Sequence, residues 1–208
     1  WQLRAAPALG AVHGEVVADW LAESRTEAAA DRILDAADAL FARHDAASVG
    51  MNDIAKASGC SRATLYRYFE NRDALYTAYV HREAHRVFQS LGEHLDRTAD
   101  PGEQIVEGVL ASLRRVRESP ALSSWFDPSQ RPIGGEMAER SDVIRGRTEA
   151  YLGALGVAHV ENRARWLVRV IVSLLVFPGH DEADERAMLE EFVLPTLMPV
   201  GEPLQKEH

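Results

Sequence analysis

The stretch from Met51 to Leu75 reads MNDIAKASGCSRATLYRYFENRDAL, and it decides the fold of the first part of the chain. It holds two short helical patterns separated by Gly59, because a glycine can adopt the left-handed conformation that ends a helix. Ser61 is expected to cap the second helix, since its hydroxyl can accept a hydrogen bond from a free backbone N–H group. Leu65 and Phe69 lie four residues apart and are expected to face the first helix. The spacing therefore predicts a helix-turn-helix, whose second helix would enter a major groove of DNA.

The same stretch resembles the DNA-binding domain of tetracycline-repressor (TetR) family regulators. The resemblance rests on Asp53-Ile54-Ala55, on Gly59, on the run from Ser61 to Phe69 and on Asn71-Arg72-Asp73-Ala74-Leu75. At the level of motifs it covers roughly residues 26–80. It implies a three-helix DNA-binding domain, followed by a larger helical domain for ligand binding and dimerisation. A helical hairpin without a DNA role is the alternative for this stretch.

The resemblance also implies a role for each exposed position of the second helix. The predicted DNA-binding residues are Ser61, Arg62, Ala63, Thr64, Tyr66, Arg67, Tyr68 and Arg72. Arg62, Thr64 and Arg67 lie where the family reaches base edges, and the two tyrosines and Arg72 lie where it grips phosphates. Many members place a Thr or Ser at the start of the first helix of the motif, where its hydroxyl meets a phosphate. Gly50 stands at about that place here, so this contact is expected to be lost or displaced.

The charge of the chain is distributed unevenly. The net charge is −9, which by itself argues against a nucleic-acid partner. Residues 56–86, however, hold six basic side chains against three acidic ones. A compact basic footprint on an acidic body suits a protein that touches DNA through one small face.

Composition and hydropathy place the chain in the bacterial cytoplasm as the default prediction. The single cysteine, Cys60, excludes an intrachain disulfide, fits a reducing compartment and is expected to be a buried, inert thiol. The most apolar segment, residues 167–177, is interrupted by Arg169 and followed by Pro178. No membrane span and no secretory leader are therefore expected.

The helical pattern divides the chain into three predicted parts. Residues 1–23 form an extension with a short amphipathic helix, which we expect to pack on its own body rather than to bind a partner. Ser24 and Glu27 form a capping-box signature that predicts the start of the next helix. The DNA-binding domain is predicted at residues 24–75 and the ligand-binding and dimerisation domain at 76–208, with a long helix from Asn71 towards Leu95 linking them.

The second half shows only helical patterns, so an all-α chain of about nine or ten helices is predicted. Helices are expected to start at Asp100-Pro101 and at Ser119-Pro120, where an N-cap precedes a proline. A helix of mixed polarity is predicted for about residues 136–155 and a strongly apolar one for 163–177. The last helix is expected to begin near Asp181 and to kink or end at Pro195.

The resemblance places two further sites in this half. The effector is expected between helices that carry Val109, Leu110, Leu113, Trp125, Phe126, Met137 and Trp166. These side chains favour an apolar or amphipathic molecule. The last two long helices are expected to form a four-helix bundle with those of a second copy, through Val170, Leu174, Phe177, Leu189 and Phe192.

The predicted function is that of a dimeric transcriptional repressor, released from a near-palindromic double-stranded DNA operator by a small hydrophobic effector. A two-fold dimer would read half-sites roughly 34–36 Å apart, or a multiple of that distance. The main alternative is a helix-turn-helix regulator controlled by a protein partner. An enzyme is a remote alternative, because no catalytic residue pattern and no cofactor motif is visible. His81 and His85 lie four residues apart, but no further ligand accompanies them and no metal is expected.

Overall fold

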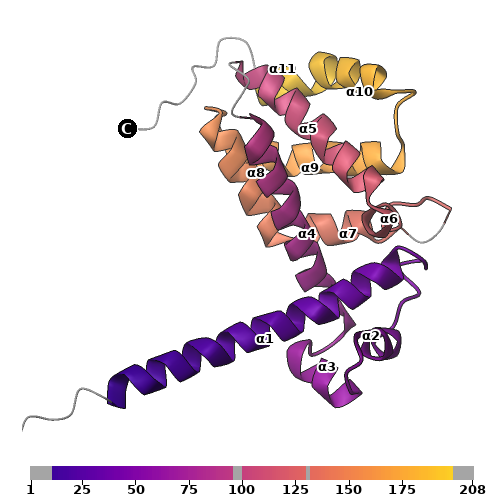
Figure 1. The fold of residues 1–208 in the computed structure, drawn as a ribbon. Helices are drawn as coiled ribbons and strands as arrows, with labels where there is room; N and C mark the ends of the chain where they lie inside the picture. The colour runs from indigo at the N-terminus through magenta and orange to yellow at the C-terminus, as the bar shows by residue number, and fades with distance from the viewer. Residues whose placement is uncertain (1–10, 96–99, 130–131, 199–208) are drawn as a thin grey trace, which may run out of the picture.

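The computed structural model describes the backbone of residues 11–95, 100–129 and 132–198, and the side chains of residues 26–92, 100–129 and 132–198. Throughout these ranges the elements are helical and no strand occurs, which confirms the predicted all-α class. The elements are α1 (Ala11–Phe41), α2 (Met51–Ser58), α3 (Arg62–Tyr68), α4 (Arg72–Leu95), α5 (Pro101–Glu118), α6 (Pro120–Ser123), α7 (Gly134–Arg140), α8 (Asp142–Ala154), α9 (Val160–Val176), α10 (Glu182–Met188), the π-helical turn η1 (Leu189–Val193) and α11 (Leu194–Leu197). In Figure 1, α1–α3 form the lower part of the molecule, and α4 leads from them into the remaining helices.

Helix α1 is a single helix from Ala11 to Phe41, and the predicted start at Ser24 is therefore wrong. The capping residues do not interrupt the helix because the sequence from Glu15 to Leu40 contains neither glycine nor proline. The backbone of its first half extends beyond α3 and away from the C-terminal helices (Figure 1). Residues 1–10 lie outside the described residues, and the role of residues 1–23 stays a prediction.

Local hydrogen bonds define the helix-turn-helix as the sequence predicts. Helix α2 starts after Gly50, whose N–H group donates to Asp53 Oδ2 at 3.0 Å. It ends at Gly59, which has a φ of 68° and so occupies the left-handed region that favours glycine. Helix α3 begins after Ser61, whose Oγ accepts a hydrogen bond of 3.0 Å from the N–H group of Thr64.

The region predicted as one helix over residues 136–155 contains two. Helix α7 ends at Arg140 and α8 begins at Asp142, with Ser141 between them. Ser141 Oγ accepts a 3.2 Å hydrogen bond from the N–H group of Ile144, so this side chain caps a new helix. The sequence predicts one helix because a helix interior can tolerate a serine. Serine is also a favoured N-cap residue, and Ser141 takes that role.

The C-terminal helix does not end at Pro195, where a kink or end was predicted. After α10 the chain widens into the π-helical turn η1 and continues as α11 to Leu197. Proline has no N–H group, so the α-helical bond to the carbonyl of Glu191 cannot form. The wider turn lets the helix continue past this position.

The buried side chains form two hydrophobic cores. The first joins α1–α4 to residues of the second half, among them Leu122, Trp125 and Met137. The second joins α5, α8, α9 and the C-terminal helices, with Leu110 and Leu167 among its fully buried members. The first core therefore crosses the domain boundary predicted after residue 75, and that boundary stays a prediction.

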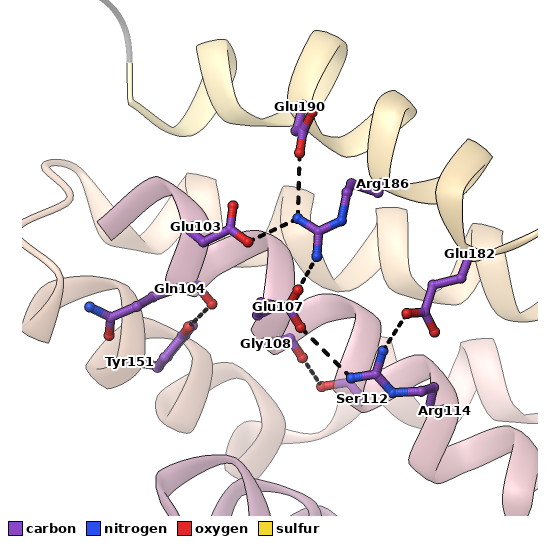
Figure 2. Close-up of polar contacts among 10 residues, drawn as sticks. All are labelled: Glu103, Gln104, Glu107, Gly108, Ser112, Arg114, Tyr151, Glu182, Arg186 and Glu190. Carbon is purple, nitrogen blue, oxygen red and sulfur yellow. Dashed lines mark hydrogen bonds and ion pairs between the residues drawn. The ribbon is translucent and has the colours of Figure 1, made fainter. Parts of the chain in front are cut away.

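Charged side chains attach α10 to α5. Figure 2 shows Arg186 of α10 between two carboxylates of α5. Its Nη1 lies 2.9 Å from Glu103 Oε1, and its Nη2 contacts Glu107. A second pair has its arginine on α5 and its carboxylate on α10: Arg114 Nη1 lies 2.7 Å from Glu182 Oε1. These pairs link α10 to α5 at the surface of the second core.

Other predictions concern membranes, metals and the thiol. In the part of the chain that the structure describes, no helix is long and apolar enough to cross a membrane. Within that part, no group of three or more metal-ligating side chains gathers; the Nδ1 atom of His85 contacts Arg147 instead. Cys60 is half-buried, and not fully buried as expected, with its Sγ 3.2 Å from Ser58 Oγ.

Candidate functional site

Helix α3 divides its side chains between the core and the surface. Leu65 and Phe69 are buried in the first core, as predicted. The predicted DNA-binding residues lie outside it: Ser61, Arg62, Ala63, Tyr66, Arg67 and Arg72 are exposed, and Thr64 and Tyr68 are half-buried. An exposed helix face held by a buried opposite face is the arrangement that a recognition helix requires.

Three cations on and beside α3 form no ion pair with a described residue. Lys56, Arg62 and Arg67 are exposed, and no carboxylate of a described residue forms an ion pair with them. The guanidinium carbon of Arg67 lies 5.3 Å from the centre of the Tyr68 ring. Unpaired cations on one small face favour a polyanion such as the phosphate backbone of DNA.

Two arginines of the basic window do not belong to this face. Arg82 and Arg86 pair with Glu83, with Nε–Oε1 and Nη1–Oε1 distances of 3.2 and 2.7 Å. Arg82 also lies 2.8 Å from Asp35 Oδ1 of α1. The basic footprint is therefore smaller than the sequence window of residues 56–86.

Arg72 was predicted to grip a phosphate, but its guanidinium serves the fold. Nη2 donates to the carbonyls of Ala46 and Ala47 and to the hydroxyl of Tyr76, the last at 3.0 Å. The Tyr76 hydroxyl oxygen lies 2.6 and 2.8 Å from the carbonyl oxygens of Ala46 and Val49, which share its one proton. Arg72 thus fixes the loop that precedes α2, and any phosphate contact would be additional to this role.

A cavity of about 130 Å³ lies among α4, α5, α6, α7, α8 and α9. Most of its wall is apolar; the polar side chains that reach it are Glu83, Ser112 and Thr148, together with the indole of Trp125. At Gly134 a Cβ atom would lie 2.6 Å from the Phe126 ring, so the ring at this wall requires a glycine beneath it.

Only part of the predicted effector set reaches this cavity. Trp125 and Phe126 line it. The others do not: Val109, Leu110 and Leu113 are buried in the second core, Met137 is buried in the first, and Trp166 is 48% exposed. On α5 the lining side chains are Ser112 and Val116, which occupy the face next to the predicted one. Sequence spacing predicts the apolar stripe of α5, but it does not predict which helices this stripe packs against.

Helix α4 contributes wall residues that the prediction missed. Val80, Ala84, Val87 and Phe88 recur at helical spacing and all line the cavity. The helical spacing of these apolar side chains is present in the sequence, but it predicts only a linking helix and does not indicate that the helix lines a cavity. The helix that follows α3 is therefore also a wall of the cavity.

Trp125 connects the cavity wall to the first core. It is 2% exposed, and its ring centroid lies 5.2–5.3 Å from the ring centroids of Phe41, Tyr76 and Tyr79. Burial raises the pKa of Tyr79, and the hydrogen bond to Asp38 raises it further, so the phenol stays a donor. Trp125 is thus both a lining residue and a core residue, and truncating it would destabilise the fold.

Comparison with known proteins decides the family. The family model for "Bacterial regulatory proteins, tetR family" matches residues 33–79. The HTH-type transcriptional regulator Rv1255c of Mycobacterium tuberculosis (strain ATCC 25618 / H37Rv) is 54% identical over 191 residues, which cover 90% of this chain and 95% of that protein. The chain belongs to the TetR family. It is a helix-turn-helix transcriptional regulator, and the role of α3 as its recognition helix stays a prediction.

Solved structures of TetR-family proteins share the fold. The TetR family repressor AlkX from Dietzia sp. strain DQ12-45-1b has a TM-score of 0.59 and 23% identity, covering 80% of this chain and 93% of that chain. RolR in complex with resorcinol has a TM-score of 0.67 and 16% identity, covering 88% of this chain and 98% of that chain. At these identities the likeness concerns the fold alone.

The predicted dimer residues of this TetR-family chain separate into two groups. Leu174 and Leu189 are 8% and 1% exposed and pack in the second core of the monomer, so their role as dimer contacts stays a prediction. Phe177 and Phe192 are 72% and 63% exposed, and Val170 is half-buried. Trp166 shares the helical spacing of Val170 and Phe177, so it belongs with the outer face of α9 and not with the cavity. The position of each side chain around the axis of α9 determines whether it faces the second core or the surface.

Proposed function

We propose that this TetR-family regulator is a dimeric repressor, which leaves a near-palindromic operator when a small apolar or amphipathic molecule fills the cavity. The observation that carries the proposal is the position of α4. This helix begins at Arg72, directly after the recognition helix, and its residues 80–88 form one wall of the cavity. A ligand that favours one position of α4 would therefore change the position of α3.

Relatives support a small effector. RolR was solved with resorcinol, a single-ring molecule, and AlkX from Dietzia is described as a repressor implicated in the biodegradation of n-alkanes. The cavity of this chain is largely apolar and about 130 Å³ in volume. An engineered cavity of about 150 Å³ binds benzene, so a compact ligand is the appropriate size.

A second copy of the chain would cover the outer face of α9. Trp166, Phe177 and Phe192 are large apolar side chains that the described part of the monomer leaves exposed. Exposed apolar surface of this kind marks interaction sites. The resulting two-fold dimer would place two copies of α3 on one side of a DNA duplex, in the bacterial cytoplasm.

Control by a protein partner is the second candidate function. The observation that favours it is the first half of α1, whose backbone extends beyond the other helices (Figure 1). Deleting residues 1–23 separates the two functions. A small-molecule repressor keeps its effector response after the deletion, whereas a partner-controlled one loses its control.

The proposed function is tested by selection followed by titration. Purified protein is used to select duplexes from a random pool, and the enriched site is expected to have two-fold symmetry. A thermal-shift screen of small hydrophobic molecules then provides candidate effectors, each of which is added to the protein–DNA complex. Enrichment of sites without symmetry would contradict the dimer, and hits that leave the complex intact would contradict effector control.

A further inference from the structure

Three of the four polar side chains that line the cavity offer hydrogen-bond acceptors, and the fourth, Trp125, has a buried Nε1–H group for which no described residue provides an acceptor. Ser112 Oγ donates its proton to the carbonyl of Gly108 at 2.8 Å, within its own helix. Thr148 Oγ1 donates in the same way to the carbonyl of Ile144, also at 2.8 Å. A hydroxyl has one proton to donate, so both oxygens are left to the cavity only as acceptors.

The third polar side chain of the wall, Glu83, is also an acceptor. It is 6% exposed, lines the cavity and is the one charged residue among the described lining residues. Its Oε1 receives hydrogen bonds from Arg82 and Arg86. No described residue donates a hydrogen bond to Oε2, and an ionised carboxylate can accept several.

The pairing of Glu83 with Arg82 and Arg86 also determines which ligand charge the cavity favours. Glu83 is already paired with two cations, so the wall does not require a third. An anionic ligand would place a second carboxylate against Glu83 in an apolar enclosure, which is costly. A neutral ligand satisfies the acceptor without adding a buried charge.

We propose that the effector is a neutral, compact ring compound with a hydroxyl donor, in the manner of a phenol, and that Glu83 selects it by accepting this hydrogen bond. The proposal rests on the proposed effector function and adds the polarity of the ligand. Size restricts the ligand to about one ring. Glu83 requires a donor, and the oxygen of a ligand hydroxyl can also accept from the unpartnered Trp125 N–H group. Molecules of the same shape that carry only an acceptor leave Glu83 unsatisfied and are rejected.

The test compares ligands of nearly the same shape on the full chain without DNA. 3-Methylphenol, 3-fluorotoluene and 3-methylbenzoate differ at one substituent, which is a donor, a non-donor and an anion, respectively. Binding is measured by isothermal titration calorimetry. We expect 3-methylphenol to bind at least about 10-fold more tightly than either of the others, since a hydrogen bond to a charged group is typically worth that factor. Equal binding of the phenol and the fluoro compound would overturn the proposal, and so would tighter binding of the benzoate.

Variants identify the acceptor. Glu83→Gln keeps the volume but removes the charge, and we expect it to reduce the preference for the phenol over the fluoro compound by about 5-fold or more. Glu139→Gln is the matched control, because Glu139 pairs with Arg169 and is not a lining residue, and its preference should equal that of the unmodified protein. An unchanged preference in Glu83→Gln would overturn the role of Glu83.

Two further results decide the proposal if Glu83→Gln does not fold or if none of the compounds binds. If Glu83→Gln does not fold, Thr148→Val removes a second acceptor with nearly constant shape, and the preference should fall there as well. Retention of the full preference in Thr148→Val would then contradict an acceptor wall. If none of the three compounds binds, the proposed ligand class is wrong. The proposed function would in that case fail only if the broader screen also finds no molecule that releases DNA.

Discussion

Arg62 and Arg72 have the same side chain but opposite surroundings. Arg62 is exposed at the start of α3 and has no ion pair with a described residue, whereas Arg72 donates to backbone carbonyls and to Tyr76. The first is available to DNA and the second maintains the loop before α2. Substitutions at the two positions should therefore affect different properties.

Arg62→Ala should weaken operator binding without affecting the fold. We expect a loss of about 1–3 kcal/mol in binding free energy and a relaxed base preference at one position of each half-site. Titration of the selected duplex and of its single-base variants measures both. Arg145→Ala, which removes an exposed arginine of α8, is the control and should bind like the unmodified protein. Full retention of base preference in Arg62→Ala would contradict its assignment to base edges.

Arg72→Ala should lower stability and weaken binding to all duplexes alike. The carbonyls of Ala46 and Ala47 lose a charged donor, which typically costs about 1.5–3 kcal/mol. Urea unfolding gives the stability, and binding at several salt concentrations gives the number of phosphate contacts. An unfolding midpoint equal to that of the unmodified protein would show that the internal hydrogen bonds contribute nothing.

Residues whose partners lie within one helical turn could be predicted from the sequence. Ser61 and Asp100 are predicted caps, and Asn71 marks the predicted start of the linking helix. Each accepts a hydrogen bond from the N–H group three positions later. The role of Arg72 could not be predicted, because its partners are backbone carbonyls distant in sequence. The same limit applies to Glu83, which reaches the cavity only through the packing of six helices.

Helix α10 depends on one buried carboxylate, Glu185. It is 2% exposed and accepts two hydrogen bonds from Arg117 of α5, at 2.6 and 2.9 Å, and one from the Gly179 N–H group at 3.0 Å. The hydrogen bond from Arg117 is the main cause that lowers the pKa of this carboxyl below its usual value. A carboxyl whose pKa is lower in the folded state stabilises the fold above its unfolded pKa, and this contribution is lost as the pH falls through the folded pKa.

Glu185→Gln should therefore destabilise the protein at neutral pH and have less effect in acid. We expect a loss of about 1–3 kcal/mol at pH 7, measured by urea unfolding. The difference from the unmodified protein should shrink as the pH falls below about 4.3, the ordinary pKa of a glutamate. Glu190→Gln, which removes an exposed partner of Arg186, should show little difference at any pH. A difference for Glu185→Gln that is constant with pH would contradict the role of its charge.

Most elements could be predicted from local signals, but their boundaries depended on competition between signals. The helix-turn-helix was found because its caps, glycine and apolar spacing agree. The start predicted at Ser24 was wrong because a capping pattern does not end a helix that lacks a breaker. The division of residues 136–155 was missed because Ser141 is acceptable in either state until its surroundings select one.

At the scale of the whole molecule, the outer face of α9 is the surface that a dimer would cover. Phe177→Glu should give a folded monomer, because the exposed ring tolerates a charge in the monomer but not in an interface. Light scattering measures the mass, and circular dichroism measures the helicity. Leu174→Glu is the contrasting variant, since it places a charge in the second core and should unfold the chain. A dimeric Phe177→Glu protein would show that the interface lies elsewhere.

The central claim is that the cavity and the DNA-binding face are thermodynamically coupled. Such coupling is reciprocal: an effector that weakens operator binding by some factor must itself bind more weakly by the same factor when the operator is present. The most direct measurement is the affinity of an effector identified by the screen, determined by calorimetry with and without saturating operator duplex. We predict that the operator lowers effector affinity about 5-fold or more, and by the factor seen in the reverse titration. The same effector affinity with and without operator would contradict the claim.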